Sequence, residues 1–296
     1  MNNFIEYYYN IVNITVHKKD NYYYFYNGNI VYTFMPTKRT MEELIAIYKL
    51  LNFDNRYNKI ILNKNKLPIT NYKNNQYVLI KLLYKNEKID LRDLKKSKLN
   101  MAKDFTSILR NNWNYLLSKK IDYIEYQRYH LEDKHRKLYE ILDYYIGMAE
   151  NSISYLNTTI INEKANIMDG LVISHRRIES VEKNSFYNPL DIIIDHPSRD
   201  ISEYLKRIFI DEMYSMEKIK EIFADLKLSK FGWQLLYGRM LYPSFFFDCY
   251  EKIINDKKPV EIIYSIIDRS KEYELYLYNI YVLINEKIKI PKIDWV

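Results

Sequence analysis

Residues 170–204 read GLVISHRRIESVEKNSFYNPLDIIIDHPSRDISEY and interrupt a part of the chain that otherwise shows helical periodicity. Two apolar runs inside this segment, 170–174 and 191–195, have the length of short strands and flank a polar connection. Helical patterns precede the segment at 134–156 and resume after it at 201–209. The pattern therefore predicts a β-hairpin in the middle of a helical region.

The first part of the chain has a different pattern, with several short strands and one helix. The expected strands cover 22–26, 30–35, 59–62 and 76–83. Asn27-Gly28 is typical of a hairpin turn between the first two strands. Thr40 followed by Glu43 predicts a capping box at the start of a helix over 41–51. A hairpin and a meander at this spacing exclude a doubly wound parallel sheet.

Helical periodicity dominates from residue 95 onward, with further helices expected over 99–117 and 263–288. The sequence thus predicts an α+β protein with a small mixed β lobe carrying one helix, residues 1–84, and a larger mainly helical lobe, residues 85–296. The second lobe contains the segment 170–204. This order of elements is the outline of a two-lobed protein-kinase-like fold.

Composition excludes several classes of protein. With 296 residues, 48% of them hydrophobic, the chain can bury a substantial core, but no apolar run approaches the roughly 20 residues of a membrane span. The N-terminus lacks the pattern of a secretory signal, so we expect a cytoplasmic protein. Cys249 is the only cysteine, which excludes an intramolecular disulfide and a cysteine zinc site. We interpret Cys249 as a small buried hydrophobe on a helix.

The net charge of +7 does not predict nucleic-acid binding, because Lys and Arg are interleaved with Asp and Glu instead of being clustered. His130 and His135 lie in such a charged stretch and are interpreted as surface residues. The chain is also rich in tyrosine, with 32 residues. Tyrosine suits contact surfaces, although core packing explains most of these positions.

Four phrases give the chain a specific resemblance: YYIGMAENSISYL, ISHRR, IDHPSRDISEYL and FGWQLLYGRMLYP. In order and spacing they resemble the C-terminal lobe of the aminoglycoside-phosphotransferase branch of the kinase-like superfamily. Within that branch they are most similar to the CotS and YutH group of spore coat proteins. The resemblance extends over nearly the full chain and is most specific in the C-terminal lobe.

The resemblance implies a degenerate catalytic loop at His175, Arg176 and Arg177. His175 matches the loop histidine, but Arg177 stands where active relatives have the catalytic aspartate. A guanidinium stays protonated and cannot accept the proton of a substrate hydroxyl. Glu182 stands at the position of the metal-binding asparagine, and Asn184 competes for that place if the loop has another length.

Two acidic positions of active relatives are retained. Asp195 matches the magnesium-binding aspartate, and Asp200 matches the structural aspartate that follows it. Asp195 is alternatively a capping residue after its strand, while Asp200 is interpreted as structural, as an N-cap of the next helix. Arg176 and Arg177 either clamp an anionic ligand or, as we favour, form an internal ion pair with Asp195.

The first lobe lacks the lysine that positions nucleotide phosphates in kinases. Its expected place is Thr33, and Lys38 lies beyond Pro36. Glu42 or Glu43 would match the helix glutamate that pairs with this lysine, although a first-turn residue that stabilises the helix dipole is the simpler interpretation.

The strand that would enter the hinge beside adenine contains Tyr77, Val78, Leu79 and Ile80. Backbone hydrogen bonds at a hinge tolerate any sequence, so this strand does not decide whether nucleotide binds.

These features favour a kinase-like pseudoenzyme. The resemblance implies a structural or interaction component of the bacterial spore coat, made in the mother cell and assembled with other coat proteins, without a cofactor. The alternative is an active small-molecule phosphotransferase that uses ATP and Mg²⁺. It would need an unorthodox base, Glu179 or Glu182, with Asp195 holding the metal.

Overall fold

The computed structural model describes residues 1–52, 54–99, 103–110, 112–128, 136–256 and 258–294, so that His130 and His135 lie outside the described residues. The chain forms two compact units. The first comprises Met1–Leu109 and Ile173–Ile194, and the second comprises Arg110–Val172 and Asp195–Val296. The boundary expected after residue 84 falls inside the first unit. As a boundary between lobes it stays a prediction.

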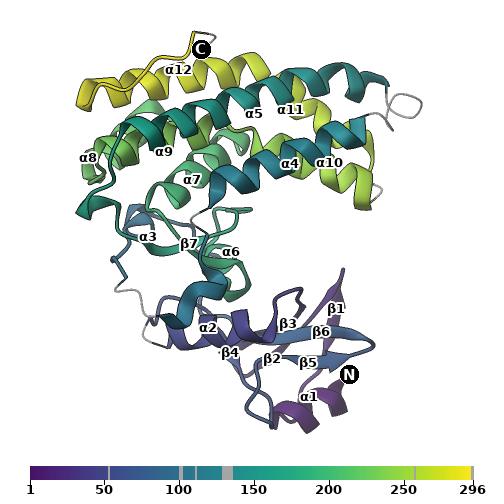
Figure 1. Ribbon diagram of the computed structural model, residues 1–296. Helices are drawn as coiled ribbons and strands as arrows, with labels where there is room; N and C mark the ends of the chain where they lie inside the picture. The colour runs from purple at the N-terminus through teal and green to yellow at the C-terminus, as the bar shows by residue number, and fades with distance from the viewer. Residues whose placement is uncertain (53, 100–102, 111, 129–135, 257, 295–296) are drawn as a thin grey trace. The chain divides into compact units, whose positions relative to one another are not determined.

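The first unit is built on a six-stranded sheet whose strand pairs are antiparallel (Figure 1). The strands are β1 (His17–Lys19), β2 (Tyr22–Asn27), β3 (Ile30–Pro36), β4 (Lys59–Ile61), β5 (Thr70–Tyr72) and β6 (Asn75–Lys81). Their order is β1-β2-β3-β6-β4, and β5 also pairs with β6. The helical segments are α1 (Asn2–Tyr9), α2 (Met41–Leu51), α3 (Leu91–Leu94), η1 (Lys103–Ile108), α6 (Lys183–Phe186) and η3 (Pro189–Asp191).

The hairpin and the capped helix follow from local sequence. Asn27 is the last residue of β2, so the two-residue loop consists of Gly28 and Asn29, one position later than expected. Gly28 has φ +57°, a conformation that costs glycine little. The capping box of α2 is confirmed: Thr40 Oγ1 accepts from the Glu43 N–H at 3.2 Å, and Glu43 Oε2 accepts from the Thr40 N–H at 3.1 Å.

The core of the first unit includes Phe25, Phe34 and Leu79 of the sheet, which pack with Ile5 of α1. The sequence prediction missed α1. This helix has no side-chain cap, and its residues carry weak helix signals. It forms because burial of Ile5 against the sheet provides a stabilisation that local propensity lacks.

The second unit is helical. It contains α4 (Trp113–Arg128), α5 (Arg136–Asn162), η2 (Ile167–Asp169), α7 (Ser198–Ile210), α8 (Met216–Asp225), α9 (Lys230–Leu241), α10 (Ser244–Asp256), η4 (Val260–Ile263), α11 (Tyr264–Asp268) and α12 (Ser270–Lys287). Helix α9 packs against α5 and α7 and is buried from Gly232 to Leu241, so it is the centre of this unit. None of the described helices is long and apolar enough to cross a membrane.

Two expected helices have different bounds. The helix over 99–117 is wrong, because η1 occupies 103–108 and α4 begins only at Trp113. Between them Leu109 pairs with Ile194 as an isolated parallel bridge, which is extended geometry. The helix over 263–288 is divided into α11 and α12 at Arg269, whose side chain bonds to backbone carbonyls of α7.

Candidate functional site

Residues 170–204 fold around a two-stranded sheet, in which β7 (Val172–His175) pairs with β8 (Ile192–Asp195). His175 ends β7 and is 1% exposed. Its ring lies 4.3 Å from the ring centroid of Phe186 and 6.0 Å from that of Tyr57. The loop histidine is therefore part of an aromatic core in the first unit.

The two arginines after His175 are held within the first unit. The Arg176 N–H donates to the Asp191 carbonyl at 2.8 Å, and its guanidinium lies 3.5 Å from Glu43 Oε1. Arg177 Nη1 donates to the Arg176 carbonyl at 3.1 Å. The ion pair expected between these arginines and Asp195 would join residues of different units, and it stays a prediction.

Glu182 is exposed and lies in a stretch of extended pairing. Its backbone forms an antiparallel bridge with Lys88. On either side of this bridge, Ile89 N–H donates to the Val181 carbonyl at 2.7 Å and Lys183 N–H donates to the Glu87 carbonyl at 2.7 Å. The residue expected to replace the metal-binding asparagine thus has its carboxylate on the surface.

The four hinge-strand residues lie in β6, which pairs with β3 on one side and with β4 and β5 on the other. Tyr77, Val78, Leu79 and Ile80 are buried in this sheet. A strand with neighbours on both sides uses its backbone donors and acceptors in the ladder. The groups that could face a ligand therefore come after β6.

Two asparagine side chains bind the backbone just after β6. Asn58 Oδ1 accepts from the Leu83 N–H at 2.9 Å. Asn184 uses both ends of its amide on Tyr84: Oδ1 accepts from the N–H at 3.2 Å, and Nδ2 donates to the carbonyl at 2.7 Å. An amide paired in this way presents one donor and one acceptor to a single residue. We call Asn58 and Asn184 the hinge amides.

Thr33, the expected place of the missing phosphate lysine, lies within β3 and is 8% exposed. The cation near α2 is Arg39, which is 2% exposed and donates to the carbonyls of Leu190 at 2.9 Å and Ile192 at 2.5 Å. Its third contact is Glu43 Oε1, at 3.1 Å. Glu43 therefore combines the capping function with an ion pair.

The charges around Glu43 affect its acidity. Burial raises the pKa of Glu43, but the Thr40 N–H and the charges of Arg39 and Arg176 outweigh burial and lower it. The carboxylate is thus ionised and serves to hold two guanidinium groups.

Asp195 is fully buried at the end of β8. Its carboxylate pairs with two arginines that also belong to the second unit. Arg239 Nη2 of α9 donates to Oδ1 at 2.8 Å, and Arg199 Nη1 lies 3.6 Å from Oδ2. The His196 N–H also donates to Oδ1, at 2.6 Å. Oδ1 thus accepts two hydrogen bonds, whereas the buried Oδ2 accepts none from the described residues and has only the Arg199 guanidinium nearby.

The His196 ring contacts Asp169 and Ser198. Its Nε2 lies 3.1 Å from Asp169 Oδ1, and its Nδ1 accepts from the Ser198 N–H at 3.0 Å. Ser229 Oγ donates to both Asp169 oxygens, at 2.8 and 2.7 Å. This serine, histidine and aspartate set is buried, and it fastens the start of α7. It therefore anchors the turn and does not form an accessible nucleophile.

The remaining predicted residues have structural positions. Asp200 is 1% exposed, but α7 begins at Ser198, so it lies in the first turn and the predicted N-cap position is wrong. Cys249 is half-buried on α10, and burial raises the pKa of its thiol. Phe246 and Phe247 are core residues, whereas Phe245 lines a cavity.

Magnesium binding by Asp195 stays a prediction, and so does nucleotide binding. A magnesium site needs oxygen ligands at short distance, and Asp195 Oδ1 is already bonded to a guanidinium. Within the described ranges, no group of three or more His, Cys, Asp or Glu side chains could hold a metal ion.

Sequence reasoning missed Arg239 and Asn58, and it considered Asn184 only as an alternative metal ligand, whereas its amide bonds to the Tyr84 backbone. The signal for Arg239 was present, because a lone arginine in the apolar run FGWQLLYGRMLYP predicts a buried cation that needs a partner. No comparable signal marked Asn58, since asparagine is common throughout this chain.

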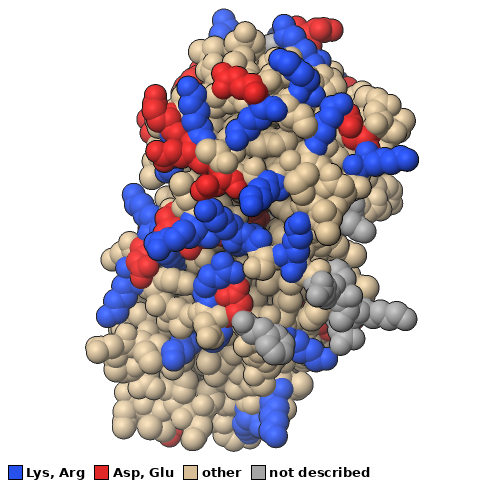
Figure 2. Space-filling view, turned by 90° about the vertical axis from the view of Figure 1, so that its left-hand side faces the viewer, with Lys and Arg blue, Asp and Glu red and all other residues tan. Residues whose placement is uncertain are grey.

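Basic and acidic side chains are interspersed over much of the face shown in Figure 2. This agrees with the interpretation of the charged stretches as solvated surface.

Comparisons with known proteins connect this geometry to a family. Residues 2–280 match the family described as spore coat putative kinase YutH. A 205-residue stretch is 27% identical to the endospore coat-associated protein YutH of Bacillus subtilis (strain 168); the match covers 62% of this chain and 60% of that protein's length.

Solved structures show the same fold at low identity. An aminoglycoside phosphotransferase from Alicyclobacillus acidocaldarius matches with a TM-score of 0.59 at 8% identity, covering 92% of each chain. A spectinomycin phosphotransferase in complex with ADP and spectinomycin matches with a TM-score of 0.53 at 9% identity, covering 98% of this chain and 94% of that one. The predicted kinase-like α+β fold is confirmed.

Proposed function

Because the chain belongs to the family of YutH spore coat putative kinases, we propose that it is a kinase-like pseudoenzyme of the bacterial spore coat. It would be made in the mother-cell cytoplasm and assembled onto the coat, with other coat proteins as partners and without a cofactor. The coat-associated relative from Bacillus subtilis supports the location.

The ion pair of Asp195 with Arg239 carries the proposal of inactivity. In phosphoryl transfer, an aspartate at this position contributes its charge to the metal that bridges the phosphates. Here the carboxylate is buried and bonded to Arg239 Nη2 at 2.8 Å. Freeing it for a metal would leave a guanidinium without a counter-charge in the interior, which is strongly unfavourable.

The proton acceptor is also missing. Arg177 stands where the aspartate of active relatives belongs, and a guanidinium has no lone pair to offer at physiological pH. A pseudoenzyme would retain the loop as a folding element. The burial of His175 among Tyr57 and Phe186 supports that interpretation.

The hinge amides give a further reason to expect weak nucleotide binding. Adenine needs backbone donors and acceptors at a hinge, but Asn58 and Asn184 already bond to those of Leu83 and Tyr84. A base competing for these groups would have to displace a protein amide held at 2.7 to 3.2 Å. Such an exchange yields little net hydrogen-bond energy.

A thermal-unfolding titration with ATP and Mg²⁺ tests the proposal. We expect no change in Tm at millimolar nucleotide, whereas a ligand at 100 times its Kd would add about 2.7 kcal/mol of stability. The matched control is an active aminoglycoside phosphotransferase under the same conditions. A nucleotide-dependent shift that Asp195→Ala removes would contradict an empty nucleotide site.

Transfer of labelled phosphate from ATP tests the alternative enzyme directly. Glu179 and Glu182 are both exposed, so either carboxylate could reach a solvent-borne hydroxyl. An active phosphotransferase would show turnover that Glu179→Gln or Glu182→Gln reduces. Absence of turnover in the wild-type protein with a panel of amino sugars and amino alcohols is the expected result.

A fluorescent fusion expressed during sporulation tests the coat assignment. We expect the signal to collect around the forespore and to remain with purified spores after washing. A signal that stays diffuse in the mother cell would overturn this part of the proposal.

A further inference from the structure

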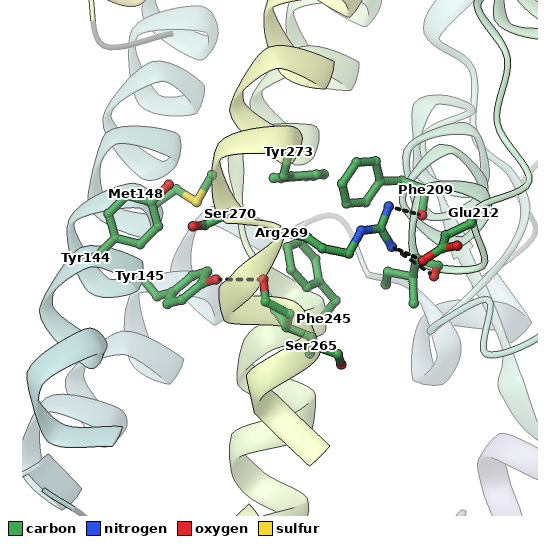
Figure 3. Close-up of a pocket in the computed structure, with 12 residues that line it drawn as sticks. Tyr144, Tyr145, Met148, Phe209, Glu212, Phe245, Ser265, Arg269, Ser270 and Tyr273 are labelled. Carbon is green, nitrogen blue, oxygen red and sulfur yellow. Dashed lines mark hydrogen bonds and ion pairs between the residues drawn. The ribbon is translucent and has the colours of Figure 1, made fainter. Parts of the chain in front are cut away.

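A cavity of about 120 Å³ lies among the helices of the second unit, and Phe245 and Arg269 are among its lining residues. Its walls are five aromatic rings, those of Tyr144, Tyr145, Phe209, Phe245 and Tyr273. Figure 3 shows Tyr144 and Tyr145 projecting from α5, with Tyr273 on α12. Phe209 comes from α7 and Phe245 from α10, so four helices contribute the rings, and α11 adds Ser265 and Ile266 to the lining.

The cavity has a buried interior and an exposed rim. Tyr145, Tyr273 and Met148 are 1%, 2% and 4% exposed, whereas Tyr144 and Glu212 at the rim are 38% and 76% exposed. A ligand could therefore enter from solvent and still lose most of its contact with water. Voids of this size are uncommon in close-packed interiors.

The charged groups beside the cavity are already paired with each other. Arg269 donates to both carboxylate oxygens of Glu272, at 2.7 and 2.9 Å. It also donates to the carbonyls of Phe209 at 3.1 Å and Ile210 at 3.3 Å, and its guanidinium lies 4.4 Å from the Phe209 ring centroid. An anionic ligand would have to compete with Glu272 for this arginine.

The tyrosine hydroxyls are also engaged, which leaves the rings to line the space. Tyr144 donates to Glu274 at 2.5 Å, Tyr273 to the Met240 carbonyl at 2.7 Å, and Tyr145 to the Ile266 carbonyl at 3.4 Å. Burial raises the pKa of all three phenols, so they are neutral at physiological pH.

We propose that this cavity is a binding site for a small uncharged ligand that contains one aromatic ring. The size agrees, because an apolar engineered cavity of about 150 Å³ binds benzene. Aromatic walls offer edge-to-face and offset-stacked contacts, and Met148 offers a thioether contact to a ring. Ser270 is a half-buried lining residue whose hydroxyl could pair with a phenolic hydroxyl, whereas Ser265 lies at the exposed edge. Binding at this site does not depend on whether the chain binds nucleotide.

Methyl NMR of protein labelled with ¹³C-methyl methionine tests the proposal. Met148 is in the lining, and its resonance is assigned by its loss in Met148→Leu. We expect phenol to shift this resonance saturably in the millimolar range. Benzoate and benzylammonium should bind about tenfold or more weakly, because a buried charge would lack a partner. Equal binding of benzoate, or no saturable shift with phenol, would overturn the proposal.

Two serine variants provide a matched pair. Ser270→Phe places a ring at a half-buried position of the lining and should abolish the phenol-dependent shift, while Ser154→Phe adds the same ring to an exposed site on α5 outside this cavity and should leave it unchanged. Retention of binding in Ser270→Phe would contradict the assigned location. The wild-type titration with the three ligands decides the ligand class even if Ser270→Phe does not fold.

Discussion

Arg239 of α9 donates a hydrogen bond of 2.8 Å to Asp195 Oδ1, and the two side chains are 7% and 1% exposed. The guanidinium also lies 5.3 Å from the ring centroid of Trp113. The aspartate that resembles a metal ligand is thus part of the interior of the second unit. Its charge stabilises the fold through Arg239.

Arg239→Met should lower the free energy of unfolding by about 3–5 kcal/mol, because it leaves a buried carboxylate without its main partner. Urea unfolding followed by circular dichroism measures the loss. The double variant Asp195→Asn with Arg239→Met should recover much of it, since no buried charge remains. A double variant as unstable as the single one would show that the pair acts only through packing.

Gly238→Ala should destabilise the contact between α9 and α5. A Cβ at this position would lie 2.4 Å from Leu156 Cδ2 and 3.1 Å from Tyr155 Cδ1, closer than van der Waals contact. We expect a loss of about 1–3 kcal/mol, typical of overpacking. Gly147→Ala on α5 is the control, because nothing lies within 4 Å of its Cβ and alanine favours helix by up to about 1 kcal/mol. A loss as large in Gly147→Ala would contradict the packing explanation.

Ionised Asp169 stabilises the folded protein, so the free energy of unfolding should fall when acid protonates it. Burial raises the pKa of Asp169, but hydrogen bonds with His196 and with other donors outweigh burial and lower it. A carboxyl with a lowered pKa in the folded state contributes stability above its unfolded pKa, which is about 3.9. That contribution is lost as pH falls through the folded pKa. Urea unfolding from pH 6 to pH 3 should show a steeper decline in wild type than in Asp169→Asn.

Asp191 should change the pH dependence of stability in the opposite direction from Asp169. Burial and the charge of Glu179 raise its pKa in the folded protein. The folded state then holds the proton more tightly, so this group contributes stability at low pH that is lost as pH rises through the folded pKa. Asp191→Asn removes this titration. The free energy of unfolding should therefore fall less in the variant than in the wild type between acid and neutral pH. An unchanged pH profile would contradict the assignment.

Asn184→Ala should remove the amide that holds the Tyr84 backbone. Loss of its bonds at 3.2 and 2.7 Å leaves a half-buried N–H and carbonyl without this partner, and we expect a cost of about 1–3 kcal/mol. Thermal unfolding measures it. Asn71→Ala on β5, an exposed site in the same unit, should change stability by less than about 0.5 kcal/mol. Similar losses in both variants would argue against a special function of the hinge amides.

The sequence predicted those elements whose signals are local. The capping box at Thr40, the hairpin of β2 and β3, and the helix α5 all depend on residues a few positions apart. It failed where tertiary contact overrides local pattern. Burial of Ile5 stabilises α1, and the bonds of Arg269 to α7 divide the final helical stretch.

The sequence by itself determined the kinase-like resemblance, because that is a property of residue order, while the loss of the catalytic aspartate at Arg177 stays a prediction. Only the tertiary structure decided what the retained Asp195 does. Its partner Arg239 lies 44 residues away in the chain, and no periodicity or spacing connects the two. A buried charge takes the partner that packing brings within reach, and packing is set by the whole set of helices in the second unit.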